Sequence, residues 1–327
     1  MNKIPDLMCS LIVPIYNGEK YIDRFVECLE EQIYPSDDYE VIFVNDGSTD
    51  NSVQKLSDIC KQFSNYVLIN KSNGGVSSAR NFGIRNSRGK YLIFADIDDC
   101  FGKEYISNLM SADFKYDLVS SGIRMERDNG REIIKRYPPM EYMKDGAQFF
   151  SSEVMKIWGG GICHRFNKSI IVNNGILFPE DISHSEDQIF LNIYLSKATI
   201  IKTLDNVDYL YKWNDNSLTK QRNLKKHKEE LRVIESMSEI YDPRDEKVLN
   251  AKAWIWMNCI GTYIKYYIDG MLYRQCYSLI VEMCEEEKFR ELIWHIIKKE
   301  TVGWKINAIL ICLRQYGFLI WMRGRKR

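Results

Sequence analysis

The chain has 327 residues, 45% of them hydrophobic and 28% charged, which is typical of a globular protein with one large domain and a smaller one. Lysine plus arginine equals aspartate plus glutamate at 45 each, so the overall charge indicates neither a nucleic-acid-binding protein nor an acidic tail. No run of 18 apolar residues occurs, and residues 1–6 lack the apolar segment of a signal peptide, so we expect neither a transmembrane helix nor a leader.

The nine cysteines form no Cys-x-x-Cys pair and are odd in number. This spacing argues against a zinc site and against a disulfide framework. We therefore expect reduced, mostly buried thiols and a cytoplasmic protein.

Short apolar runs alternate with amphipathic stretches through the first hundred residues. Strands are predicted at four of these runs, 11–15, 41–44, 67–69 and 91–95. Helices are predicted between them, around 22–33, 53–63 and 79–84. Strands that are apolar throughout and alternate with helices predict a mostly parallel sheet covered on both faces, in an α/β fold.

Polar residues follow three of the predicted strands. They are Asn17, Asp46 and the acidic group Asp96, Asp98 and Asp99. Loops that follow parallel strands open on the same edge of the sheet, where ligands bind in open α/β folds. Three carboxylates this close repel one another unless a cation lies among them, and an oxygen-ligated Mn²⁺ or Mg²⁺ is the simplest partner. A solvated acidic turn or a helix N-cap is the alternative interpretation of these acids.

The pattern becomes mixed from about residue 117. Strands are predicted at 118–123 and 133–137, with a hairpin turn between them at 128–130. Helices are predicted at 145–156 and 168–174. A further helix is predicted to begin with Glu186 and Asp187, since acids are stabilised at the positive end of the helix dipole.

Residues 221–327 have helical spacing and no recognisable strand, so we predict an α-helical region appended to a domain at 1–220. The segment 306–327 is apolar and basic, with no acid after Glu300. It fits an amphipathic helix lying on an anionic membrane surface, such as the inner face of the cell membrane. A packed terminal helix with a solvated basic tail is the alternative.

Five motifs together resemble glycosyltransferase family 2 over about residues 8 to 219. They are Ile12-Val13-Pro14-Ile15-Tyr16-Asn17, Val44-Asn45-Asp46-Gly47-Ser48-Thr49-Asp50, Asn73-Gly74-Gly75-Val76-Ser77-Ser78-Ala79-Arg80-Asn81, Asp96-Ile97-Asp98-Asp99 and Glu186-Asp187. Members of this family are inverting enzymes of the GT-A fold that use nucleotide-diphosphate sugars. The resemblance therefore implies a GT-A domain at 1–220.

The resemblance also implies a nucleotide-sugar site made of Pro14, Tyr16, Asn17, Asp46, Arg80, Asp96, Asp98 and Asp99. Within it, Asp46 would read the nucleobase, and Arg80 would lie near the nucleotide or the diphosphate. Asp96 and Asp98 would hold the divalent metal, and Asp99 would extend this motif toward the sugar or the metal.

Asp187 matches the catalytic base of the family, with Glu186 in reserve. The implied reaction is a single displacement in which an acceptor hydroxyl attacks the anomeric carbon while the nucleoside diphosphate leaves. The expected donor is a UDP-sugar, and the expected acceptor is a saccharide or a lipid-linked glycan in surface polysaccharide synthesis. His164 and Arg165 are interpreted either as facing the acceptor or as loop surface.

Two other functions remain as alternatives. A sugar nucleotidyltransferase would need a glycine- and arginine-rich phosphate loop where Tyr16-Asn17-Gly18-Glu19-Lys20 stands. A non-catalytic carbohydrate- or nucleotide-sugar-binding protein on the same fold would not need the acids, which are intact here.

Overall fold

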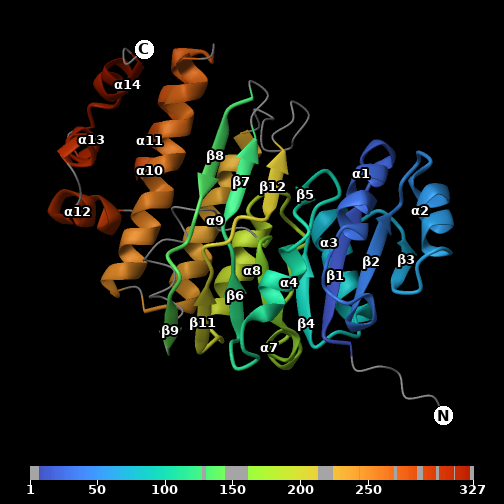
Figure 1. Ribbon diagram of the computed structural model, residues 1–327. Helices are drawn as coiled ribbons and strands as arrows, with labels where there is room; N and C mark the ends of the chain where they lie inside the picture. Colours follow the sequence, from blue (N-terminus) through green and yellow to red (C-terminus); the bar gives the residue numbers. More distant parts are fainter. Residues whose placement is uncertain are drawn as a thin grey trace. The chain divides into compact units, whose positions relative to one another are not determined.

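The computed structural model describes residues 7–126, 130–143, 161–212, 224–242, 244–268, 271–285, 290–299, 302–312 and 314–324 (Figure 1). The chain divides into two compact units, Met1–Gln221 and Arg222–Arg327. The predicted helix near 145–156, the hairpin tip at 128–129 and the final basic residues 325–327 lie outside the described residues.

An eight-stranded sheet forms the centre of the first unit, in the order β3-β2-β1-β4-β10-β6-β11-β9. Its strands are β1 (Cys9–Ile15), β2 (Tyr39–Asp46), β3 (Tyr66–Lys71), β4 (Tyr91–Phe94), β6 (Leu118–Ser120), β9 (Glu141–Met143), β10 (His164–Asn167) and β11 (Ile200–Thr203). The four strands predicted first are all present and parallel, with β1 between β2 and β4. Beyond them, β10 runs antiparallel to both β4 and β6.

Helices link and cover the parallel strands, and they are α1 (Glu19–Glu30), α2 (Ser52–Cys60) and α3 (Gly75–Asn86). α3 packs against β1 and β2, and α2 packs against β2 and β3. Strands β1, β2 and β4 are buried along their whole length, because side chains on both faces of this sheet lie under other elements. The first unit also contains a 3-10 turn (Ser36–Asp38), α4 (Tyr105–Ser111), α7 (Lys168–Asn173) and α8 (Glu186–Leu195).

A smaller sheet has the order β5-β12-β7-β8. Its strands are β5 (Cys100–Phe101), β7 (Ile123–Glu126), β8 (Glu132–Lys135) and β12 (Tyr209–Lys212). β7 and β8 are antiparallel, as the hairpin prediction requires. The single strand predicted at 118–123 is wrong, because it is interrupted at residues 121 and 122, where the chain passes from β6 of the large sheet to β7 of the small one. A Cβ atom on Gly122 would lie 2.6 Å from the carbonyl oxygen of Lys135, so this approach of two backbones requires glycine.

In the described residues of the second unit, every regular element is a helix. Its helices are α9 (Leu224–Ile240), α10 (Glu246–Ile268), α11 (Tyr273–Glu285), α12 (Arg290–Lys299), α13 (Val302–Cys312) and α14 (Tyr316–Gly324). Trp256 and Tyr263 are buried in its core. None of the helices that the structure describes has the length and apolar character needed to cross a membrane.

Two helical glycines provide a matched test of how closely α3 packs on the sheet. A Cβ atom on Gly83 would lie 2.4 Å from Ile12 Cγ2, whereas one on Gly261 of α10 would meet no atom within 4 Å. We expect Gly83→Ala to lower the free energy of unfolding by about 1–3 kcal/mol because α3 must shift away from β1. Gly261→Ala should raise it by about 0.5–1 kcal/mol, since alanine is the better helix former. Urea denaturation measures both, and equal stability of the two variants would contradict this packing.

Candidate active site

The loops after β1 and β2 are hydrogen-bonded to each other at the carboxyl edge of the large sheet. The side-chain oxygen of Asn17 accepts a hydrogen bond from the Thr49 N–H at 2.8 Å, and the Asn17 N–H donates to Ser48 Oγ at 3.0 Å. Asn17 has a φ of +50°, a conformation that asparagine tolerates better than most residues. Pro14 is buried in β1, whereas the Tyr16 side chain is 55% exposed. The two loops thus form one surface that presents an aromatic ring.

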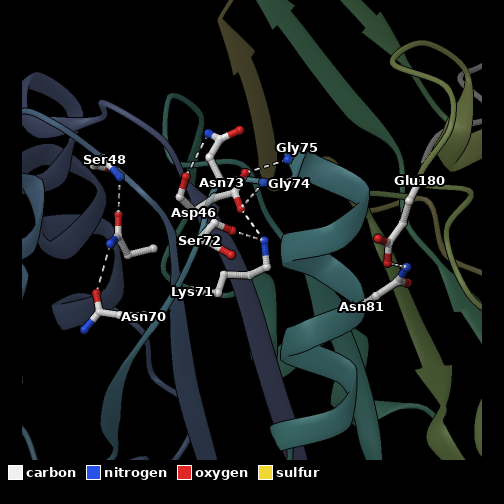
Figure 2. A network of polar contacts seen from close by, with 11 residues as sticks. Asp46, Ser48, Asn70, Lys71, Ser72, Asn73, Gly74, Gly75, Asn81 and Glu180 are labelled. Atoms are coloured by element: carbon white, nitrogen blue, oxygen red, sulfur yellow. Dashed lines mark hydrogen bonds and ion pairs between the residues drawn. The ribbon is translucent and has the colours of Figure 1, made fainter.

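Asp46 is the last residue of β2, and its side chain is only 4% exposed. One carboxylate oxygen accepts hydrogen bonds from Lys71 Nζ at 2.5 Å and from the Gly74 N–H at 3.0 Å (Figure 2). The other oxygen accepts from the Gly75 N–H at 2.7 Å. Gly75 begins α3, so the negative charge of Asp46 lies at the positive end of this helix. Because a carboxylate oxygen can accept two hydrogen bonds, Oδ2 has capacity for one more donor.

Arg80 lies on α3 and is 5% exposed. Its Nη2 donates to Asp96 Oδ1 and its Nη1 to Glu186 Oε1, each at 2.9 Å. Burial by itself would lower the pKa of Arg80, but the carboxylates of Asp96 and Glu186 hold it above its usual value. The guanidinium therefore joins the turn after β4 to the first residue of α8.

The acidic turn after β4 separates its three carboxylates. The side chain of Asp96 is 32% exposed and Asp98 is partly exposed, whereas Asp99 is 2% exposed. Asp99 accepts hydrogen bonds from the Tyr209 hydroxyl at 2.7 Å and from the Lys212 N–H at 3.3 Å. Burial, together with repulsion from Asp96 and Asp98, raises the pKa of Asp99 well above its usual value. Only the first two acids thus remain accessible to solvent.

Asp96 and Asp98 fit the oxygen-donor chemistry of Mn²⁺ or Mg²⁺. Arg80 occupies one oxygen of Asp96 and leaves the other outside this ion pair. No group of three or more histidine, cysteine or acidic side chains suited to hold a metal occurs among the described residues. A cation bound here would need further ligands besides these two side chains.

α8 begins with Glu186 and Asp187. The preceding residue, Ser185, has a φ of +61°, a conformation that costs energy for a non-glycine residue and is common at functional sites. Glu186 is buried, and one of its oxygens is bound to Arg80. The two acids thus differ, since only Glu186 has an ion pair with the guanidinium.

Asp187 is partly buried beside this ion pair. Its oxygens accept hydrogen bonds from the Gln188 N–H at 2.8 Å and from the Gly161 N–H at 3.4 Å. Burial and repulsion from Glu186 raise the pKa of Asp187 to about 7, against the lowering effect of Arg80. A carboxylate with such a pKa can accept a proton near neutral pH.

Helix α3 brings the predicted site residues together. Asp46 binds its first residue, Gly75, and Arg80 lies five residues further along, a rise of about 7.5 Å. Arg80 in turn holds Asp96 and Glu186. The roles predicted for these residues in binding and catalysis remain predictions, whereas their arrangement around α3 is a property of the fold.

Both interpretations of His164 and Arg165 are wrong. The two residues are 1% and 0% exposed, because they belong to β10 in the interior of the sheet. His164 Nδ1 lies 2.7 Å from Ser120 Oγ, and Arg165 donates to the carbonyl oxygens of Ala112 and Asp113 at the end of α4. Neither side chain is available to an acceptor.

Two side chains at the site were missed by the sequence analysis. Lys71 pairs with Asp46, and the register of β2 and β3 places these two residues opposite each other. A parallel pairing of the two predicted strands could have suggested that contact. Tyr209 bonds Asp99 from far along the chain, and no sequence pattern links the two.

A family model described as glycosyl transferase family 2 matches residues 10–171. The chain is 31% identical over 209 residues to a poly(ribitol-phosphate) beta-glucosyltransferase of Bacillus spizizenii, covering 62% of this chain and 32% of the relative. It is 30% identical over 224 residues to an uncharacterized glycosyltransferase, EpsJ, of Bacillus subtilis, covering 65% of this chain and 63% of the relative. The chain spans less than two thirds of the length of either relative.

Solved structures share the fold at low sequence identity. Staphylococcus aureus TarS 1-349 in complex with UDP-GlcNAc superposes with a TM-score of 0.72 at 18% identity, over 95% of this chain and 89% of that chain. The mannosyltransferase PcManGT from Pyrobaculum calidifontis, in complex with GDP-Man and Mn²⁺, gives a TM-score of 0.53 at 16% identity, over 97% and 86% of the two chains. The predicted α/β fold of GT-A type with an appended helical region is confirmed, as is the resemblance to the family.

Removal of the Arg80 guanidinium should destabilise the first unit. We expect Arg80→Met to lower the free energy of unfolding at pH 8 by about 3–5 kcal/mol, because it leaves Glu186 buried without its cation. Arg85→Met on the same helix is the control, since Arg85 is exposed and its removal should cost less than about 0.5 kcal/mol.

Combining Arg80→Met with Glu186→Gln should restore part of the lost stability, since the buried charge is then gone. Urea denaturation followed by circular dichroism measures all four proteins. Equal midpoints for Arg80→Met and Arg85→Met would show that the guanidinium does not hold these segments together.

Proposed function

We propose that this chain is a glycosyltransferase, from the match of residues 10–171 to the model described as glycosyl transferase family 2 and from the geometry of the site. It moves a sugar from a nucleoside-diphosphate sugar, foremost a UDP-sugar, to a hydroxyl group of a saccharide or lipid-linked glycan. The observation that best supports the proposal is the Arg80 bridge, which joins Asp96 to Glu186, the neighbour of Asp187 in the chain.

The nucleoside would bind at the edge formed by the loops after β1 and β2. Asp46 Oδ2, with its remaining acceptor capacity, would receive an N–H of the base. Pro14, Tyr16 and Asn17 lie at the end of β1 and in the loop after it, where Tyr16 offers an exposed ring for the nucleoside.

The diphosphate would lie over the acidic turn after β4. Asp96 and Asp98 would hold Mn²⁺ or Mg²⁺, which offsets the negative charge of the departing nucleoside diphosphate. Arg80 would keep Asp96 in place for this role through its 2.9 Å hydrogen bond. Asp99, which is buried, would support the turn from behind.

Asp187 would serve as the base that takes the proton of the acceptor hydroxyl, giving an inverting single displacement. Its raised pKa of about 7 suits this task, since a base works best when its pKa lies near the operating pH. Glu186 is less suited, because its carboxylate is bound to Arg80.

The acceptor would belong to a surface polysaccharide or a teichoic-acid-like polymer. Support comes from the names of the relatives, one of which is a poly(ribitol-phosphate) beta-glucosyltransferase and another the minor teichoic acid biosynthesis protein GgaA of Bacillus subtilis. Pyrophosphate release from a nucleoside triphosphate would instead favour the nucleotidyltransferase alternative. Donor binding without transfer would favour the non-catalytic one.

Transfer should depend on ionised Asp187. We expect Asp187→Asn to lower kcat by about 10²–10⁴-fold, while Asp58→Asn on exposed α2 leaves it unchanged. In the wild type, kcat/KM should fall about tenfold per pH unit below pH 7, because only the charged carboxylate accepts a proton. Nucleoside diphosphate release with a matched polymer acceptor measures both, and near-wild-type turnover of the Asp187 variant would eliminate this base.

Asp187→Asn, which should lower the rate of transfer, should raise the stability of the folded chain above neutral pH. The pKa of Asp187 is raised from 3.8 to about 7 in the folded chain, so its stabilising contribution is complete below pH 4 and is lost as the pH rises through 7. Asp187→Asn should therefore melt at a higher temperature than the wild type at pH 8, and the difference should shrink toward pH 4.

Peripheral membrane contact through 306–327 is a further part of the proposal. Residues 301–327 contain six basic residues and no acid. Ile306, Ile309 and Phe318 are 42%, 45% and 50% exposed on α13 and α14. Exposed apolar side chains on a basic segment fit an anionic lipid surface.

Flotation with vesicles tests the membrane contact. The full chain should float with phosphatidylglycerol vesicles and not with phosphatidylcholine vesicles, because the basic segment needs anionic lipid. Replacing Ile306, Ile309 and Phe318 by Glu should abolish flotation, whereas Ile33→Glu, at a 58% exposed site in the first unit, should not. Equal flotation of the triple Glu variant and of Ile33→Glu would contradict the proposed membrane-binding surface.

A further inference from the structure

One phenol hydroxyl bridges the two ends of the acidic turn after β4. Tyr209, the first residue of β12, accepts a hydrogen bond from the Asp96 N–H at 3.2 Å and donates one to Asp99 Oδ2 at 2.7 Å. The turn itself is closed by the Asp99 N–H, which donates to the Asp96 carbonyl oxygen at 3.1 Å. One side chain thus connects the first and the last acid of the motif.

Strand β12 holds the turn at a second point. The Lys212 N–H donates to Asp99 Oδ1 at 3.3 Å, and β12 pairs with β5, which directly follows the turn. In that pairing Tyr209 lies opposite Phe101. The carboxylate of Asp99 is therefore held from both ends of the strand.

The ring of Tyr209 is fixed, so its hydroxyl cannot follow a moving turn. Tyr209 is 0% exposed, and its ring centroid lies 5.4 Å from that of Tyr105 and 6.3 Å from that of Phe101. Side chains packed this closely keep a single position. The main chain at Asp96 is consequently held where its carboxylate meets Arg80.

We propose that Tyr209 is a positioning residue for the diphosphate end of the donor site. Its hydroxyl draws Asp99 into the interior and fixes the backbone of Asp96, which leaves Asp96 and Asp98 as the two acids facing solvent. This inference rests on the proposed function, because it requires that a nucleoside diphosphate and a divalent cation bind at the turn. It adds a residue that contacts neither ligand and acts through the acids.

Isothermal titration calorimetry on the full chain measures binding at the nucleoside end and at the diphosphate end of the donor site separately. The probes are uridine, UDP, and UDP with MnCl₂. In the wild type we expect Mn²⁺ to increase the affinity for UDP. In Tyr209→Phe we expect this Mn²⁺-dependent gain to fall by about tenfold, because the variant loses both hydrogen bonds of the hydroxyl, while uridine binding stays within about twofold.

Tyr105→Phe is the matched control. Tyr105 is equally buried and packs against Tyr209, but among the described residues no hydrogen bond joins its hydroxyl to the acidic turn. The Mn²⁺-dependent gain should therefore be unchanged in this variant. A purely structural role for Tyr209 would weaken uridine and UDP binding equally.

Four outcomes would overturn the inference in distinguishable ways. A full Mn²⁺-dependent gain in Tyr209→Phe, or an equal loss for uridine and UDP, removes the positioning role and leaves the proposed function intact. The absence of any Mn²⁺-dependent gain in the wild type removes the metal role in the proposed function as well. If Tyr209→Phe does not fold, amide hydrogen exchange of the wild type tests the inference instead. The Asp96 N–H, which donates to the Tyr209 hydroxyl, should exchange slowly. Rapid exchange of this amide would contradict the positioning role of Tyr209.

Discussion

A buried guanidinium is the interaction on which the candidate site depends. Arg80 is 5% exposed and has one ion pair with the partly exposed Asp96 and another with the buried Glu186, so a single cation joins two acids from distant parts of the chain. Removing the charge from water is unfavourable, and the two short hydrogen bonds offset that cost. The turn after β4 and the start of α8 are thereby fixed relative to each other.

The helix that carries Arg80 organises the rest of the site. Its first residues bind the carboxylate of Asp46 through backbone N–H groups. One residue after Arg80, Asn81 donates to the Phe178 carbonyl and to Glu180, which guides the chain toward α8. The close packing of Gly83 against Ile12 sets the height of the helix over the sheet. One helix therefore fixes three loops that are distant in sequence.

Much of this site could be predicted from the sequence, because its residues follow apolar strands of a parallel sheet. Asp46 and Asp96 were placed at one edge by that rule alone, and the family resemblance added Arg80 and Asp187. Asp99 could not be distinguished from its neighbours in this way. Whether an acid in a short turn points outward or inward depends on partners such as Tyr209, which is contributed by another sheet.

The parallel strands, the helices between them and the edge at which the polar loops gather follow from the order of residues, because hydrophobic periodicity is a local property of the chain. Prediction from sequence failed at His164 and Arg165, whose polar side chains suggest a surface although they lie in the interior of the sheet. Tertiary structure alone decided which acid pairs with which cation, which carboxylate is buried, and that Asp187 has a raised pKa. Those properties depend on desolvation and on charges a few ångströms away, and these neighbours come from distant parts of the sequence.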